Sequence, residues 1–217
     1  TLFWNLPFSA SRTIANADLY FLPNWNILPS RMDIPLVLTI HDCSIQRLGW
    51  DGGWKKRLWH RSIRINRLLS QARLLLCVSR STAKELEIFF PEYKKKIRVI
   101  PLATPSVPPH ICNPYCDRWK NRQLPLVVLM SDAHQRKNIP ACLRSLATVA
   151  VPHQTVVVGA GSSKDGDRVH STGVLSPAQK DALLAHTALF FYPSFYEGFG
   201  LPPQEAVARA IPVAIAT

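Results

Sequence analysis

Short apolar runs alternate with amphipathic helical stretches along almost the whole of this 217-residue chain. Apolar runs of this length, bounded by turn and helix signals, are typical of buried strands. The expected strands are 19–22, 36–40, 74–78 and 97–100 in the first half, and 126–130, 155–158, 188–192 and 212–216 in the second. Strands that alternate with helices favour parallel sheets with right-handed crossovers. The sequence therefore predicts an α/β fold.

A proline-rich stretch without hydrophobic periodicity separates the two series of strands. It spans residues 105–123 and reads as an interdomain linker. We therefore expect an N-terminal Rossmann-like domain at 1–104 and a C-terminal, ligand-binding Rossmann-like domain at 124–217. Open parallel sheets bind ligands beyond the carboxyl ends of their strands, so we expect the two domains to face a cleft.

The two ends of the chain indicate that both domains are incomplete. Residue 1 is Thr rather than Met, and the last expected strand, 212–216, closes the chain. We expect the N-terminal domain to be truncated at its start and the C-terminal domain at its end.

Composition narrows the class of protein. Apolar residues make up 47% of the chain, which is ordinary for a globular protein. No run approaches the roughly 18 consecutive apolar residues of a membrane span. The five cysteines are odd in number and mostly lie in apolar surroundings, which favours a reducing compartment and a cytoplasmic location.

Positive charge is concentrated in the first half of the chain. The net charge is +12, and residues 52–84 hold nine basic residues and no acidic one. As a helix, the stretch Trp54–Arg73 would carry several of them on one face: Arg57, Arg61 and Arg64. That face could contact anionic lipids at the inner side of a membrane, or it is simply solvated. No nucleic-acid reader motif is present, so we expect no nucleic-acid partner.

The most specific motif is a glycine-rich turn between an apolar strand and a helix, at residues 191–205. Gly198 and Gly200 leave backbone amides unshielded, so these amides and the helix dipole can hold a phosphate. Glu197 and Glu205 bracket the turn with seven residues between them and can accept from ligand hydroxyls. A phosphate cradle with two such carboxylates suits a nucleotide-sugar.

Two further patterns fit the same ligand. Arg136 and Lys137 follow a strand at the opening of a helix, where two cations and free amides favour a diphosphate. His41 ends another strand and can donate to a sugar hydroxyl. Asp165 and Asp167 lie in a Ser/Gly/Lys-rich loop, where aspartates are ordinary turn formers, so we expect no metal site there.

The 191–213 region resembles retaining glycosyltransferases of family 4, which have the GT-B fold and include mannosyl- and glucosyltransferases. That family shows Pro-Ser-x-x-Glu-Gly-Phe-Gly-Leu-Pro-x-x-Glu-Ala followed by Pro-Val. The matching positions here are Pro193, Ser194, Glu197 to Pro202, Glu205, Ala206, Pro212 and Val213. The resemblance implies transfer of a hexose from a nucleotide diphosphate sugar to a glycan or lipid-linked acceptor, with retention of configuration and without a cofactor or bound metal.

The resemblance also implies residue roles. His41 and Glu197 would be catalytic and lie beside the transferred sugar. Glu205 would accept from the ribose hydroxyls, and Arg136 and Lys137 would neutralise the leaving diphosphate. The full implied donor-binding set is Ser131, Arg136, Lys137, Gly173, Val174, Leu175, Gly198, Phe199, Gly200, Leu201 and Glu205.

Three residues depart from the family pattern. Met130 and Ala210 stand where glycine is usual, and Gln135 stands where proline is usual. Two other functions remain open beside hexosyl transfer. One is a non-catalytic basic module with the same fold that binds nucleic acid or membrane, and the other is a nucleotide-sugar epimerase.

Overall fold

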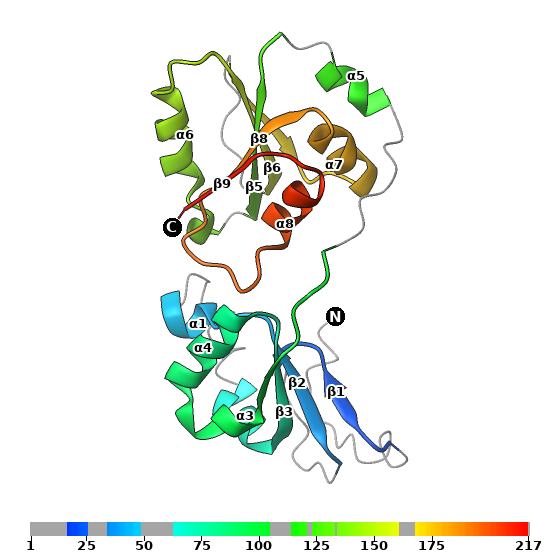
Figure 1. The fold of residues 1–217 in the computed structure, drawn as a ribbon, viewed down its shortest axis with the longest axis vertical. Coiled ribbons are helices and arrows are strands. Elements are labelled where there is room, and N and C mark those ends of the chain that lie inside the picture. Colours follow the sequence, from blue (N-terminus) through cyan, green and yellow to red (C-terminus); the bar gives the residue numbers. More distant parts are fainter. Residues whose placement is uncertain are drawn as a thin grey trace. The chain divides into compact units, whose positions relative to one another are not determined.

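The computed structural model describes residues 17–25, 34–48, 63–104, 114–120, 123–132, 134–160 and 168–216. The chain divides into two compact units, Thr1–Leu102 and Ala103–Thr217 (Figure 1). Each unit contains one sheet whose paired strands all run parallel. No helix among the described residues is long and apolar enough to cross a bilayer.

The first unit has the strand order β1-β2-β3-β4. The strands are β1 (Tyr20–Leu22), β2 (Leu36–Ile40), β3 (Ala72–Cys77) and β4 (Ile97–Val99). The helices described there are α1 (Ser44–Leu48), α3 (Ile65–Gln71), α4 (Arg80–Phe89) and the 3-10 helix η3 (Pro91–Lys96). Alternate residues of β2 are fully buried and join α3 and α4 in one apolar core, because strand side chains alternate between the two faces.

The second unit has the strand order β7-β6-β5-β8-β9. The strands are β5 (Leu126–Asp132), β6 (Gln154–Ala160), β7 (Val169–Gly173), β8 (Thr187–Tyr192) and β9 (Val213–Ile215). The helices are α5 (Pro114–Lys120), η4 (Gln135–Lys137), α6 (Ile139–Ala147), α7 (Pro177–Leu184) and α8 (Leu201–Ala208). One apolar cluster joins α6 to the sheet, and the other joins α5, α7 and α8 to its opposite face.

The eight expected strands are all present, in the expected order, in the described residues. β7 was not among the expected strands, because its residues are only half-buried and mostly polar. Three further corrections concern helices. The stretch Trp54–Arg73 was considered as one helix, but Arg64 has a left-handed backbone (φ 49°), so α3 begins only at Ile65. Residues 49–62, including Arg57 and Arg61, lie outside the described residues. A lipid contact through this stretch therefore stays a prediction.

The second correction concerns the start of α4. The sequence pattern at Thr82 predicts a capping box, but the helix begins three residues earlier. Ser79 is the N-cap, and its side chain accepts from the Thr82 backbone N–H at 3.0 Å. The Thr82 hydroxyl is buried and instead donates to the His41 carbonyl oxygen at 3.3 Å. Thr82 therefore joins α4 to the end of β2.

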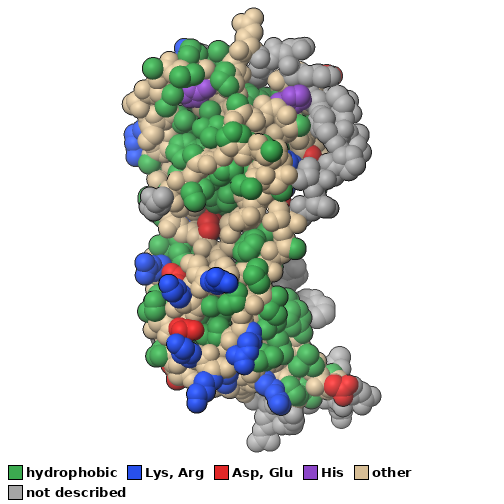
Figure 2. All heavy atoms as spheres, viewed as in Figure 1, with side chains coloured by type: hydrophobic (Ala, Val, Ile, Leu, Met, Phe, Trp, Pro, Cys, Tyr) green, Lys and Arg blue, Asp and Glu red, His purple; other side chains and the backbone are tan. Residues whose placement is uncertain are grey.

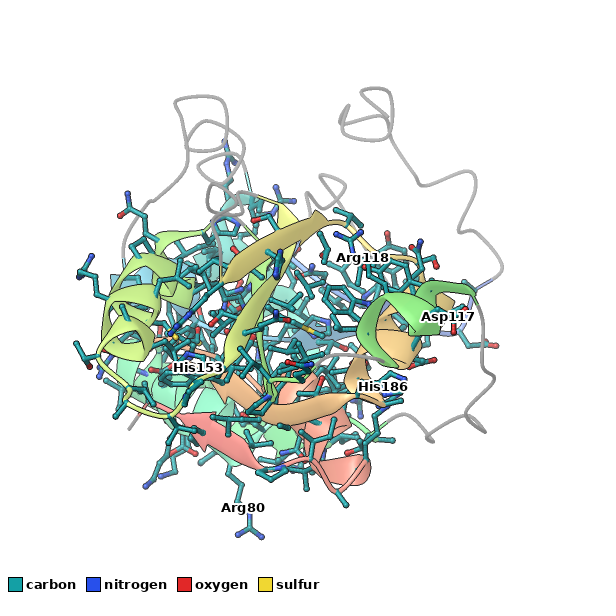
Figure 3. The ribbon with its side chains drawn as sticks, turned by 90° about the horizontal axis from the view of Figure 1, so that it is seen from above. Arg80, Asp117, Arg118, His153 and His186 are labelled. Atoms are coloured by element: carbon teal, nitrogen blue, oxygen red, sulfur yellow. The ribbon has the colours of Figure 1, made fainter. Side chains whose placement is uncertain are left out.

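The third correction is a helix inside the expected linker. α5 lies within 105–123, and its Trp119 is 2% exposed in the core of the second unit. Tyr115 packs edge-on against the Trp119 ring at 5.9 Å. α5, which carries Asp117 and Arg118, lies beside α7 (Figure 3). Proline content obscured this helix, because proline is compatible with a first helical turn as well as with a loop.

Replacing Ala210 with glycine is expected to stabilise the second unit by about 1 kcal/mol, because an L-residue in the left-handed region costs about this much. Ala210 has φ 56°, and the turn it makes after α8 is closed by a bond from the Ile211 N–H to the Ala206 carbonyl at 3.1 Å. Glycine is the usual residue at such helix ends. Urea unfolding of the full-length protein measures the change. Ala208→Gly, inside α8, is the control and should destabilise; a loss of stability in Ala210→Gly would contradict the prediction.

Candidate functional site

The candidate site lies where the order of the second sheet reverses. β5 is in the centre, the chain moves from it to β6 and β7 on one side, and β8 and β9 lie on the other. Open α/β sheets bind ligands at this switch point, beyond the carboxyl ends of the strands. The loops that leave β5 and β8 therefore frame the expected pocket. They carry the cationic pair and the glycine-rich turn.

The cations are placed by a short helical turn after β5. Arg136 and Lys137 end η4, and Asn138 follows with φ 53°, a left-handed conformation that asparagine tolerates. This turn starts α6 and points the two neighbouring side chains back over the end of the sheet. The Arg136 carbonyl accepts from the Phe195 N–H at 2.9 Å, which attaches the loop after β8 to η4.

The side chains around Arg136 and Lys137, called the cationic corner below, are held together by one carboxylate oxygen. Oε1 of Glu197 accepts from Nη1 of Arg136 at 2.6 Å, Nζ of Lys137 at 2.7 Å, the Ser194 hydroxyl at 2.7 Å and the Tyr192 hydroxyl at 3.0 Å. The Lys137 side chain is 8% exposed and that of Glu197 24%. Charged hydrogen bonds of this kind are stronger than neutral ones, so the loops after β5 and β8 are held together by this group.

Tyr192 is a site residue that the sequence analysis missed. It ends β8 at 3% exposure, and its hydroxyl accepts from Nζ of Lys137 while donating to Glu197. The ammonium also lies 4.6 Å from the centre of the tyrosine ring. Burial, reinforced by the Glu197 charge, raises the pKa of the phenol, so Tyr192 stays protonated and remains a donor. The available signal was a tyrosine at the carboxyl end of a buried strand, a position equally common for core residues.

Glu205 forms a second charged group with α7. Its Oε2 accepts from Nζ of Lys180 at 2.7 Å, and its side chain is 16% exposed. One turn on, Arg209 bonds to Oδ1 of Asp181 at 2.5 Å and to the Glu205 carbonyl at 2.9 Å. Adjacent residues of α7 thus pair with α8 in two ion pairs, which fix the orientation of the Glu205 carboxylate.

Two family models match this chain. The one described as Glycosyltransferase Family 4 covers residues 7–104, and the one described as Glycosyl transferases group 1 covers residues 119–217. Together they include all of the expected strands and site residues. The chain belongs to the family 4-like glycosyltransferases.

Two curated mannosyltransferases are similar to this glycosyltransferase. MMP alpha-(1->4)-mannosyltransferase of Mycolicibacterium hassiacum is 26% identical over 211 residues, covering 85% of this chain and 48% of the relative. O-antigen chain mannosyltransferase B of Escherichia coli is 27% identical over 215 residues, covering 90% of this chain and 56% of the relative. The chain thus spans about half the length of these relatives.

Solved structures share the fold of the glycosyltransferase. Sucrose-phosphate synthase from Thermosynechococcus elongatus matches with a TM-score of 0.69 at 17% identity. The match covers 94% of this chain and 58% of the synthase chain. Anabaena Alr3699/HepE in complex with UDP-glucose matches with a TM-score of 0.68 at 16% identity. The match covers 95% of this chain and 61% of the HepE chain. The predicted fold class, two Rossmann-like parallel-sheet regions of the GT-B type, is confirmed.

The other expected donor residues of the glycosyltransferase lie at the same sheet edge. Ser131 is near the end of β5, Gly173 is the last residue of β7, and Val174 and Leu175 follow it. β7 is two strands away from β5, or about 10 Å. The Val174 side chain is 82% exposed. A nucleoside diphosphate can span this separation, and the donor-binding role of residues 173–175 stays a prediction.

The glycine-rich turn of the glycosyltransferase has the expected form. Gly198 and Phe199 are half-exposed, Gly200 is buried with φ 78°, and Leu201 begins α8. No side chain caps the start of this helix in the described residues, and proline occupies its first turn. The arrangement is compatible with a phosphate at the helix N-terminus, because its first N–H groups have no intrahelical acceptor.

His41 belongs to the first unit of the glycosyltransferase. Its ring Nε2 donates to the Pro23 carbonyl oxygen at 2.9 Å, and this hydrogen bond joins the ends of β1 and β2. The other ring nitrogen, Nδ1, takes no part in it. The neighbouring Asp42 accepts from the Ser44 N–H at 2.9 Å and so supports the start of α1. The catalytic role of His41 remains a prediction.

The described residues contain no cluster of three or more potential metal ligands. Asp165 and Asp167 lie outside them. Among the cysteines described, Cys43, Cys77 and Cys142 are buried and unbridged, and burial raises the pKa of each thiol to about 12. Such thiols stay protonated near neutral pH and are poor nucleophiles.

Proposed function

We propose that the full-length protein transfers a hexose from a nucleotide diphosphate sugar to a glycan or lipid-linked acceptor, with retention of configuration. The observation that carries the proposal is the convergence of Arg136, Lys137 and Glu197 at the switch point of the second sheet. The names of the similar proteins support hexosyl transfer: two are mannosyltransferases, and HepE is described in complex with UDP-glucose.

The proposed chemistry assigns a task to each charged group. The guanidinium of Arg136 and the ammonium of Lys137 would offset the charge that develops on the leaving diphosphate, since fixed cations stabilise such charge best in a water-poor site. Oε1 of Glu197 is used by four protein donors, so its second oxygen would accept from the transferred sugar. A donor phosphate oxygen would take the proton of the acceptor hydroxyl, which permits attack on the same face and hence retention.

The nucleoside end of the donor would be held by α8. Glu205 lies in the second turn of this helix, and Lys180 orients its carboxylate through Oε2. The ribose hydroxyls would then donate to Glu205. This assignment separates two parts of the donor: the diphosphate at the end of β5, and the nucleoside beside α7 and α8.

Titration of the full-length protein with UDP-glucose, GDP-mannose and inorganic pyrophosphate tests the proposal. Glu205→Gln is expected to weaken nucleotide-sugar binding about tenfold, since a hydrogen bond to a charged group contributes roughly 1.5–3 kcal/mol. Pyrophosphate lacks a ribose, so its affinity should stay within about twofold. Glu92→Gln, an exposed carboxylate on η3 of the first unit, is the matched control. Equal loss of both ligands would contradict the assignment of Glu205 to the ribose.

The same titration separates the alternative functions. Figure 2 shows Lys and Arg side chains gathered on the visible face of the first unit. If this charge alone bound a partner, affinity would depend on salt and polyanion length, and no nucleotide-sugar would saturate the protein. An epimerase would convert the donor sugar in the absence of any acceptor. Saturable donor binding with acceptor-dependent turnover and an unchanged anomeric configuration supports the proposed function.

A further inference from the structure

The charges at the cationic corner balance one another. Asp132, the last residue of β5, places Oδ2 at 2.9 Å from Nη2 of Arg136 and 3.9 Å from Nζ of Lys137. Glu197 lies at 2.6 Å from Arg136 and 2.7 Å from Lys137. Two carboxylates therefore face two cations. A diphosphate that enters this corner meets paired cations rather than an excess of positive charge.

Binding of an anion to a neutralised corner requires that one carboxylate move away, because like charges at this separation repel strongly. The two candidates differ in how firmly they are held. Oε1 of Glu197 accepts from four donors, two of them uncharged hydroxyls that the ligand does not replace. Oδ2 of Asp132 has the guanidinium at hydrogen-bond distance and the ammonium only at 3.9 Å.

Exposure points the same way. The Asp132 side chain is 39% exposed, against 24% for Glu197, so it can be hydrated as it leaves Arg136. Its other oxygen, Oδ1, accepts from the His134 N–H at 3.1 Å in the turn that leads to η4. Asp132 thus has one oxygen that supports the loop and one that neutralises Arg136. Displacing it costs less than displacing Glu197.

We propose that Asp132 is a displaceable counterion that competes with the donor diphosphate for Arg136 and thereby limits the affinity of this site for nucleoside diphosphates. The inference rests on the proposed function. This competition would affect the rate of product release as well as the affinity for the donor. The reaction product is itself a nucleoside diphosphate, and a carboxylate that reoccupies Arg136 promotes its release, a step that limits turnover in many enzymes.

Asp132→Asn tests the proposal, because the amide oxygen can still accept from the His134 N–H while the negative charge is removed. UDP and inorganic pyrophosphate are expected to bind the full-length variant about two- to fivefold more tightly than the wild type, the size expected for one partly exposed competing charge. The gain should shrink at high salt. In turnover, KM for the donor should fall, and kcat should fall as well if product release limits the rate.

Asp117→Asn is the matched control for loss of one negative charge in the same unit. Asp117 is exposed on α5, which precedes β5 and lies at the opposite, N-terminal end of that strand (Figure 1). A seven-residue strand is about 23 Å long, well beyond the screening length at physiological salt. This variant should bind pyrophosphate as the wild type does.

Three results decide the matter. In an Arg136→Gln background, the gain from Asp132→Asn should be clearly smaller, since no guanidinium remains to be released; an equal gain there overturns the proposal. Wild-type binding with no tighter binding by Asp132→Asn overturns it and leaves the proposed function intact. No binding of any nucleotide-sugar or pyrophosphate by the wild type overturns both. Should the asparagine variant melt early, Asp132→Ser keeps a short acceptor for the His134 N–H and repeats the test.

Discussion

Replacing Lys137 with methionine is expected to lower kcat/KM by about 10²- to 10³-fold, the range seen when one fixed stabiliser of developing charge is removed. Methionine keeps most of the length and apolar volume of the side chain, so the core beside β8 stays filled. The change removes the ammonium that bonds to Glu197 and to the Tyr192 hydroxyl. Initial rates with a nucleotide-sugar donor and its acceptor measure the effect.

The loss should exceed that of removing the neutral partner. Tyr192→Phe keeps the ring over which Nζ of Lys137 lies and removes only the hydroxyl between Lys137 and Glu197. We expect a decrease of about five- to tenfold, which corresponds to one hydrogen bond of roughly 1–1.4 kcal/mol. Lys84→Met, at an exposed position on α4, is the control for loss of a lysine. Activity within twofold of wild type in Lys137→Met would refute the role given to this cation.

The sequence predicted which residues form the corner but not how they contact one another. Arg136 and Glu197 are 61 residues apart, and each was identified through a local pattern as a ligand for the donor. Local patterns report the element on which a residue lies. They do not report that two loops leave neighbouring strands at a switch point, so the direct pairing of Arg136 and Lys137 with Glu197 could not be inferred.

The unpredicted features share a physical cause: each depends on tertiary packing. Tyr192 differs from an ordinary core tyrosine only because Lys137 approaches it from another element. Ser79 and Thr82 are both acceptable N-caps in sequence, and the contact of Thr82 with the His41 carbonyl favours Ser79. α5 is recognisable only through the burial of Trp119 against the second sheet. Apolar runs, in contrast, were sufficient for strands with a buried interior such as β2, β5 and β8, but not for β7, whose residues are all only half-buried.

The second large effect is expected at Gly159, where substitution by alanine should destabilise the second unit by roughly 3 kcal/mol or more. Gly159 lies in β6 with φ 108°, and it is paired in register with Ser131 of β5. A Cβ at this position would stand closer than 3.0 Å to the Ser131 carbonyl oxygen. That oxygen belongs to the backbone of the central strand, so it cannot move without disturbing the ladder between β5 and β6. The cost combines backbone strain with a steric overlap that has no flexible partner to relieve it.

Gly173→Ala separates these two contributions. Gly173 also has a positive φ, 66°, but an added Cβ there meets no atom within 4 Å. It should therefore lose only the 1–2 kcal/mol of a left-handed L-residue. Urea unfolding of both full-length variants, followed by a probe in the second unit, gives the difference.

Because Ser131 leads directly into Asp132 and the turn that carries Arg136, the displacement of β5 in Gly159→Ala should also weaken pyrophosphate binding. Equal stability of the two alanine variants would mean that the close approach of β6 to β5 does not constrain this position, and the geometry of the cationic corner would then need another support.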